Sequence, residues 1–262
     1  MKILIKLGGT LLDSIESRTR LATEVAGLQA RGLQVVVVHG GGKQMTRFLS
    51  DRGVESRFVG GLRVSTPQVI DAVLKVLAGT VNHELVASFV AAGAKAVGLS
   101  GIDASLTEAE QMHADLGAVG RPIRSDAAIL DLLTTNGYLP VVACVAGDKQ
   151  GRIFNVNADQ MAVACASGYR ADHLLFLTDV DGVKDSDGNV VSNLTPVGCE
   201  KLIAGGIATG GMQAKLNAAT DALKNGIAQV IIAPGSLERA AERILAGEPI
   251  GTRLTTEGAA NA

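Results

Sequence analysis

The chain has 262 residues, of which 47% are hydrophobic, 3% are aromatic and none is tryptophan, so it can bury a substantial aliphatic core. Its net charge is −2, from 24 basic and 26 acidic residues, and it has no basic stretch or base-stacking platform, so we expect no nucleic-acid partner. No uncharged apolar run reaches the roughly 18 residues of a membrane span, and Lys6 interrupts the apolar N-terminal stretch, so we expect a cytoplasmic protein without a membrane partner.

Short apolar segments alternate with amphipathic ones from the first residues onward. Residues 3–7 and 35–38 are aliphatic runs with little polar alternation, which is typical of buried parallel strands. Residues 11–31, between them, predict an amphipathic helix that ends at Gly32, because glycine readily adopts the conformation that closes a helix. Each of the two strands runs directly into a glycine-rich turn.

The rest of the chain continues this alternation. Ser65-Thr66-Pro67 predicts a helix start, and Gly60-Gly61 between two short strands within residues 54–63 predicts a hairpin. Residues 103–124 are polar and irregular, and we expect an excursion of short strands over the sheet. In chain order we expect helices at 43–52, 66–78, 81–92, 127–135, 158–168, 212–225 and 237–246, and strands at 96–99, 139–145, 174–177 and 229–232.

This alternation predicts an α/β protein, a three-layer αβα sandwich with a central, mainly parallel sheet and right-handed crossovers. Ligands of such sheets bind at the carboxyl ends of the strands. Four segments follow strands in this way, and we expect them to line one crevice: Lys6 with Gly8, and residues 39–42, 98–101 and 178–181.

The two N-terminal glycine turns, Gly8-Gly9 and Gly40-Gly41-Gly42, can bring bare backbone amides close to an anion at the start of the following helix. Either turn could also be an ordinary tight connection between strand and helix. Neither the P-loop nor the dinucleotide-binding fingerprint follows a strand here. If phosphates are bound, another scaffold binds them.

Five motifs occur in a characteristic order, and together they resemble the amino acid kinase family, on the branch that phosphorylates N-acetyl-L-glutamate in arginine biosynthesis. The similarity runs from residue 2 to Leu254 and includes the ending at 247–253. The motifs are Lys6-Leu-Gly-Gly, His39-Gly-Gly-Gly, Gly61-Leu-Arg-Val, Asn155-Val-Asn-Ala-Asp159 and Gly211-Met-x-x-Lys215.

The resemblance implies transfer of the γ-phosphoryl group of ATP to the γ-carboxylate of N-acetyl-L-glutamate, which gives an acyl phosphate. The nucleophile is already an anion, so no general base is needed, and catalysis depends on positioning and cationic stabilisation. It also implies a single domain over residues 1–262, with a substrate-binding lobe at about 1–170 and a nucleotide-binding lobe at about 171–254.

Lys6 and Lys215 match the family's two transition-state lysines, and Asp159 matches the aspartate that organises them. Without the family context, Lys6 could be a strand-end lysine that reaches solvent, and Lys215 an ordinary helix-surface lysine. Asp159 could be an acid that simply favours the first turn of a helix. We assign Asn157 to structure, because Asn157-Ala-Asp-Gln160 resembles a capping box.

Arg63 matches the family's clamp on the substrate α-carboxylate, a task that suits the two-pronged guanidinium; an exposed arginine is the alternative. Asn155 matches the substrate-binding asparagine. Gly41 and Gly42 are expected to present backbone amides to the substrate.

For the nucleotide, the resemblance implies that Gly8 and Gly9 line the phosphate path. It also implies that two later segments, 178–184 and 207–210, hold adenine, ribose and phosphates. A plain turn is an equal alternative for the segment at 178–184. Mg²⁺ is implied by ATP chemistry and would be held mainly by phosphates and water. The four histidines lack ligand spacing, and His39 is interpreted as a turn residue. The two segments consist of Thr178, Asp179, Val180, Asp181, Gly182, Val183 and Lys184, and of Ile207, Ala208, Thr209 and Gly210.

Arginine-inhibited members of the family carry an extra helix before the first strand, whereas here the first strand begins at residue 2. We therefore expect a homodimer that arginine does not inhibit, with the helix at 66–78 and its neighbours as the dimer surface. The stretch from Ser105 is less glycine-rich than in the family. Cys144, Cys165 and Cys199 are expected to be reduced core cysteines.

Two other functions remain open at this point. One is a sister kinase for another acidic amino acid, such as carrier-linked aminoadipate or aspartate. The other is a non-catalytic nucleotide sensor on the same fold, which the presence of both lysines and Asp159 disfavours.

Overall fold

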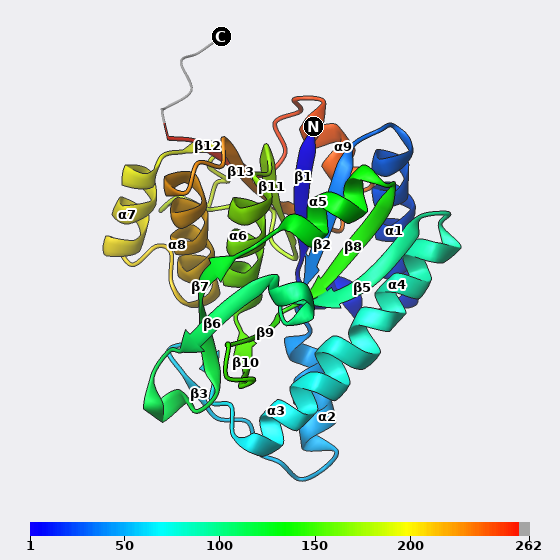
Figure 1. Ribbon diagram of the computed structural model, residues 1–262. Helices are drawn as coiled ribbons and strands as arrows, with labels where there is room; N and C mark the ends of the chain where they lie inside the picture. The colour runs from blue at the N-terminus through cyan, green and yellow to red at the C-terminus, as the bar shows by residue number, and fades with distance from the viewer. Residues whose placement is uncertain (257–262) are drawn as a thin grey trace.

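The computed structural model describes residues 1–256 and consists of a central eight-stranded sheet between two layers of helices (Figure 1). The strand order is β12-β14-β13-β11-β1-β2-β8-β5, and only β14 runs antiparallel to its neighbour β13, while every other printed pair is parallel. This confirms the predicted α/β sandwich. In sheet order the strands are β12 (Asn193–Leu194), β14 (Thr252–Leu254), β13 (Gln229–Pro234), β11 (His173–Thr178), β1 (Lys2–Leu7), β2 (Gln34–His39), β8 (Tyr138–Ala143) and β5 (Lys95–Ser100).

Helices cover both faces of this sheet. One face carries α5, α6 and α8, and the other carries α1, α4 and α9. Ser14 caps α1 by accepting a hydrogen bond from the Ser17 amide, and Thr66 caps α3 in the same way through Val69, as expected for hydroxyl caps. The helices are α1 (Ile15–Ala30), α2 (Gly42–Ser50), α3 (Pro67–Val73), α4 (Asn82–Ala91), α5 (Ala128–Thr135), α6 (Ala158–Tyr169), α7 (Pro196–Ala204), α8 (Gly210–Lys224) and α9 (Ala240–Leu245).

The two helices expected at 66–78 and 81–92 form one continuous helix, Pro67–Ala91. The gap expected between them, Gly79 and Thr80, lies in a π-helical segment, Leu74–Val81, whose wider turns keep the chain helical. Its length and its mean hydropathy of 1.3 would suffice to cross a membrane, a test that core helices also pass, and 39% of its most apolar window is buried inside the protein.

The polar stretch at 103–124 was expected to form short strands over the main sheet, but its strands belong to a separate small barrel. It supplies β6 (Thr107–Gln111) and β7 (Val119–Ser125), which close a small barrel with β9 (Val145–Gly147) and β10 (Ile153–Val156). The hairpin of β3 (Phe58–Val59) and β4 (Leu62–Arg63) turns at Gly60 and Gly61, both with positive φ, as predicted. The barrel and the hairpin gather beyond the lower end of the main sheet (Figure 1). Sequence reasoning missed β9, β10, β12, β14 and α7; the single strand expected at 139–145 ends at Ala143, and Val145 already belongs to β9.

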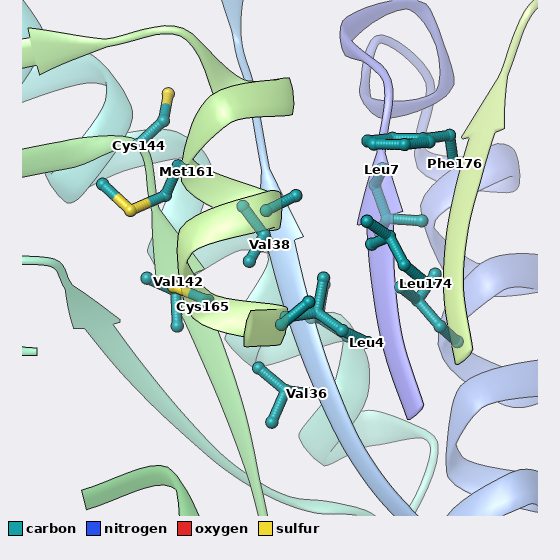
Figure 2. Close-up of a cluster of buried hydrophobic side chains, with 14 of the residues drawn as sticks. Leu4, Leu7, Val36, Val38, Val142, Cys144, Met161, Cys165, Leu174 and Phe176 are labelled. Atoms are coloured by element: carbon teal, nitrogen blue, oxygen red, sulfur yellow. The ribbon is translucent and has the colours of Figure 1, made fainter. Parts of the chain in front are cut away.

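The core lies on both faces of the sheet; one part of it lies between the sheet and α6, where aliphatic side chains from β1, β2, β8 and β11 meet that helix (Figure 2). Val36, Val38, Leu174 and Leu4 are fully buried, which explains why these strands lack polar alternation. The three cysteines are free and buried, as expected.

Candidate functional site

Two lysines and one aspartate meet at the carboxyl end of β1. Lys6 Nζ lies 2.7 Å from Asp159 Oδ1, and Lys215 Nζ lies 2.9 Å from Asp159 Oδ2. One carboxylate therefore bridges two ammonium groups that come from distant parts of the chain.

Local structure explains how each group reaches this point. Lys6 lies on the same face of β1 as Leu4, because side chains alternate between the two faces of a strand. This face packs against α6. Asp159 lies in the first turn of α6, whose N-cap Asn157 accepts hydrogen bonds from the Asp159 and Gln160 amides. The cap predicted from the sequence is confirmed, although Gln160 Oε1 is buried without a hydrogen bond and does not complete a capping box. Lys215 projects from the second turn of α8.

Burial and charge act on this cluster in opposite directions. Lys6 and Asp159 are only 6% and 5% exposed. Burial lowers the pKa of Lys6 below its ordinary 10.5, against the raising effect of Asp159. Burial would raise the pKa of Asp159, but Lys6 and Lys215 together hold it below its ordinary value. Asp159 is therefore a carboxylate at neutral pH, and its negative charge offsets one of the two positive charges of Lys6 and Lys215.

The cluster lies between two adjoining cavities of about 880 and 360 Å³, which share Lys6, Lys215 and Arg63. The larger cavity is lined by the hairpin, β10 and the first turns of α2, α6 and α8, and the smaller by Thr178, Asp179 and Lys43. Across both cavities the described lining has four basic residues against two acidic ones. Such a crevice suits anionic ligands.

Two helix N-termini add to this positive character. The N-cap residues of α2 and α8 are Gly41 and Thr209, and neither makes a side-chain cap hydrogen bond. Gly42 and Gly210, the first residues of these helices, line the larger cavity. Their amides and the helix dipoles favour an anion there.

The backbone amide of Gly8 was expected to approach an anion, and the structure shows otherwise. Gly8 lines the smaller cavity, but its amide donates a 2.9 Å hydrogen bond to Leu177 O and is not available to a ligand. A Cβ at Gly8 would lie 3.2 Å from the same carbonyl oxygen. Here the glycine permits the close approach of β1 and β11.

Arg63 is held in a defined pose between the hairpin and α2. Its guanidinium donates to Thr46 Oγ1 at 2.8 Å, to Gly42 O at 3.2 Å and to Ser56 Oγ, and it stacks over the Phe58 ring at 4.7 Å. It is not the freely exposed arginine of the alternative reading. Asn155 lies on β10 and lines the same cavity.

The nucleotide residues named from the resemblance are only partly brought together. Gly8, Thr178 and Asp179 line the smaller cavity and Gly210 the larger one. The Val183 amide donates to Thr252 Oγ1 in the interior, and Ala208 is buried. Among the residues whose side chains the structure describes, neither cavity is lined by Val180, Asp181, Gly182, Val183, Lys184, Ile207, Ala208 or Thr209.

Two other expectations need correction. His39 is the last residue of β2 and fully buried, with Nδ1 donating to Gly40 O and Nε2 accepting from Asn82 Nδ2; burial lowers its pKa to about 4. It is a neutral core residue of a strand. The end of β5 does not reach the crevice, since Gly101 lines a separate cavity beside the small barrel.

Sequence reasoning overlooked several lining residues. Phe58, Leu77 and Cys144 line the larger cavity, and Thr10 and Lys43 the smaller one. Thr10 and Lys43 directly follow the two glycine turns in the sequence, and this position could have indicated that they line the site. Leu77 reaches the cavity only because the π-helical segment brings it over Gly41, where a Cβ would lie 2.5 Å from Leu77 Cδ2.

The described residues contain no group of three or more His, Cys, Asp or Glu side chains that could hold a metal. Of the two acidic residues that line the cavities, Asp159 already pairs with two lysines. Asp179 is therefore the lining carboxylate that could bind a cation. Burial alone would raise its pKa, but a hydrogen bond from its own backbone amide, followed by Thr178, Thr10 and Lys215, favours the charged form and lowers the pKa. This donor set fits a hydrated cation held mainly by phosphate oxygens.

Sequence comparison connects this site with known proteins. The sequence model of the amino acid kinase family matches residues 1–234. The chain is 65% identical over 256 residues to an acetylglutamate kinase of Solibacter usitatus, which covers 98% of this chain and 100% of the relative. It is 43% identical over 236 residues to an acetylglutamate kinase of Acidobacterium capsulatum, with 89% and 91% covered.

Structural comparison agrees on the fold. A crystal structure from Streptococcus mutans is similar with a TM-score of 0.85 and 25% identity, over 98% of this chain and 99% of the other. An N-acetylglutamate synthase from Neisseria gonorrhoeae, complexed with coenzyme A and N-acetyl-glutamate, is similar with a TM-score of 0.85 and 23% identity, over 98% of this chain and 59% of the other. At the latter identity the likeness concerns the fold alone.

Proposed function

This chain belongs to the amino acid kinase family, and from that premise we propose that it phosphorylates the γ-carboxylate of N-acetyl-L-glutamate with ATP, in arginine biosynthesis. Its 65% identity to an acetylglutamate kinase over nearly the whole length of both chains supports this substrate. The product is the acyl phosphate N-acetyl-L-glutamyl 5-phosphate, and ADP is released.

The bridging of Lys6 and Lys215 by Asp159 is the observation that carries the proposed chemistry. A carboxylate that approaches a polyphosphate meets strong charge repulsion, and the transferred group carries spread negative charge in the transition state. Two ammonium groups held in advance by one carboxylate can stabilise that charge without reorganisation. We assign Lys6 and Lys215 to this task and Asp159 to holding them.

The remaining roles follow from position in the crevice. Arg63 binds the substrate α-carboxylate with the N–H groups that Thr46, Ser56 and Gly42 leave free, and Asn155 binds the same substrate. The amides at Gly41 and Gly42 face its γ-carboxylate. The residue types and the open start of α2 support these assignments.

ATP occupies the side of the crevice that Gly8, Thr178, Asp179 and Gly210 line. The rest of the phosphate path and of segments 178–184 and 207–210, Gly9 included, is assigned to ATP by the family resemblance. Mg²⁺, when bound, would neutralise phosphate charge and would be held mainly by phosphates and water; Asp179, which lines the smaller cavity, is the carboxylate that could help to hold it. Residues up to about 170 form the substrate lobe and residues 171–254 the nucleotide lobe. The protein acts in the cytoplasm as a homodimer.

The direct test is ADP release by the purified protein with Mg-ATP and N-acetyl-L-glutamate, with hydroxylamine to trap the acyl phosphate. Glutamate, aspartate and aminoadipate serve as parallel substrates. We expect hydroxamate with N-acetyl-L-glutamate only. Turnover with a different acid would keep the chemistry and change the substrate, and ATP binding without any turnover would favour the sensor.

A further inference from the structure

One buried hydroxyl connects the two residues assigned to the substrate. Ser65 is 1% exposed. Its Oγ donates a hydrogen bond of 3.0 Å to the Arg63 carbonyl oxygen and accepts one of 3.0 Å from Asn155 Nδ2. Arg63 and Asn155 are 92 positions apart in the sequence, so this contact exists only in the folded chain.

The backbone of Ser65 ties the same region together. Its amide donates to Leu116 O at 2.9 Å, and its carbonyl accepts from the Ala118 amide at 2.8 Å. Ala118 O in turn accepts from the Asn155 amide at 2.9 Å. The segment around Ser65 therefore sets where β10 lies relative to the hairpin, and with it where the Asn155 side chain begins.

The hydroxyl also decides which way the Asn155 amide faces. A serine hydroxyl has one proton, and here that proton goes to the Arg63 carbonyl oxygen. Only a donor can then face Ser65 Oγ, so the Nδ2 side of the amide turns toward it. Asn155 Oδ1 makes no hydrogen bond within residues 1–256, and Asn155 lines the larger cavity.

We propose that Ser65 is a positioning residue that makes Asn155 present a carbonyl oxygen, as a hydrogen-bond acceptor, to the substrate. The group recognised is an N–H on the substrate's α-nitrogen, as in an N-acylated acidic amino acid. This inference rests on the proposed function. A site built around such an acceptor discriminates against an analogue that lacks the N–H, because the buried acceptor is then left unpaired.

The probe is the ester analogue of the substrate, 2-acetoxyglutarate, in which oxygen replaces the amide N–H. We measure kcat and KM for both compounds with wild type, Ser65→Ala, Ser65→Thr and Asn155→Ala. Ser125→Ala is the matched control, since it also removes a part-buried hydroxyl that donates to a carbonyl, Leu106 O, at a residue that does not line the substrate cavity.

We expect wild type to prefer the amide by at least about tenfold in kcat/KM. Ser65→Ala should lower that preference by about fivefold, raise the KM for N-acetyl-L-glutamate, and leave kcat within about twofold, because the reacting groups are untouched. Ser65→Thr keeps the hydroxyl and should restore the preference. Ser65→Ala should have no further effect on the preference in the Asn155→Ala background, because Ser65 acts through Asn155.

A merely structural Ser65 would lower the melting temperature and leave the amide-to-ester preference unchanged, and that result would overturn the inference alone. If Ser65→Ala does not fold, Ser65→Cys replaces it, since a thiol is a weak acceptor of similar size, and the same loss of preference is expected. No turnover of N-acetyl-L-glutamate by wild type would overturn the proposed function, and this inference with it.

Discussion

At the scale of single residues, the site depends on a buried carboxylate that bridges two ammonium groups and neutralises only one of their two positive charges. Taking three charges out of water is unfavourable, and the mutual attraction offsets this only while all partners remain. Lys6 and Asp159 are almost fully buried, whereas Lys215 retains some exposure. Burying these three charges does not stabilise the fold in any obvious way. The arrangement is better explained by a need to hold positive charge in a fixed position for the transferred phosphoryl group.

Removal of either lysine should impair chemistry more than binding. We expect Lys6→Ala and Lys215→Ala to lower kcat by about 10²- to 10³-fold, as for one lost preorganised donor, with the ATP KM changed far less. Steady-state kinetics with the hydroxamate assay measure this, and Lys201→Ala on the exposed side of α7 is the control. Wild-type kcat in either variant would refute the assignment.

The buried position of Lys6 also predicts a pH dependence. Because the pKa of Lys6 is lowered below 10.5, mainly by burial, its charged form is lost at a lower pH than for a free lysine. We expect kcat to fall on the alkaline side with an apparent pKa below 10.5, measured by ADP release. The residual activity of Lys6→Arg should lack this decline, because arginine stays charged.

His39 predicts a different effect, on stability. Its pKa is about 4 in the folded protein and 6.5 ordinarily, so the unfolded chain binds the proton more readily. Stability should be complete above pH 6.5 and decline by up to roughly 3 kcal/mol as pH falls to 4. Urea unfolding of wild type and His39→Gln across this range tests it; an equal decline in both would assign the loss to other groups.

At the scale of elements, the crevice is assembled by connections between segments that have little regular structure of their own. The hairpin, the 116–118 segment and β10 meet through Ser65, and the close approach requires a glycine at Gly117. This residue has φ +64, and a Cβ there would lie 2.5 Å from Ser65 O. The backbone contact and the positive φ each disfavour any other residue.

Gly117→Ala should therefore disturb the substrate side of the crevice. We expect an unfolding free energy lower by about 1–3 kcal/mol and a raised KM for N-acetyl-L-glutamate. Gly137→Ala is the matched control, because Gly137 has φ +77 and open space around its Cβ position. Equal destabilisation and an unchanged KM in both variants would mean that only the positive φ matters.

At the scale of the whole molecule, the edge strand β5 and the helix Pro67–Ala91 leave apolar surface uncovered. Val90 on α4 is 54% exposed, and β5 ends the eight-stranded sheet with an open edge. Exposed edges and apolar faces favour association between copies.

The proposed homodimer should appear in light scattering after size exclusion as a mass about twice the 26.8 kDa of one chain. Val90→Glu should shift this mass toward the monomer, because a charge in an apolar contact is desolvated without a partner. Val197→Glu, at a similarly exposed valine on α7, should not. A wild-type monomer would contradict the proposal.

Much of the fold follows from local patterns. The aliphatic runs predicted six of the eight strands of the main sheet, and the glycine and proline signals predicted most helix ends, because period and capping depend on neighbouring residues. The continuous helix Pro67–Ala91 was misjudged, since its π-helical turns pack against distant segments, α2 and β9 of the small barrel. The short strands β12 and β14 were missed because they gain stability only by pairing with distant segments.

The sequence by itself determined which residues carry charge at strand ends, that glycines follow those strands, and that the five motifs match the amino acid kinase family. Only the tertiary structure decided that Lys6, Asp159 and Lys215 meet and that the Gly8 amide donates its hydrogen bond to Leu177 O of the sheet. It also decided that the Ser65 hydroxyl joins Arg63 to Asn155. The reason is physical: helix and strand periods are read over a few residues, whereas contacts between distant segments depend on how the whole sheet is ordered.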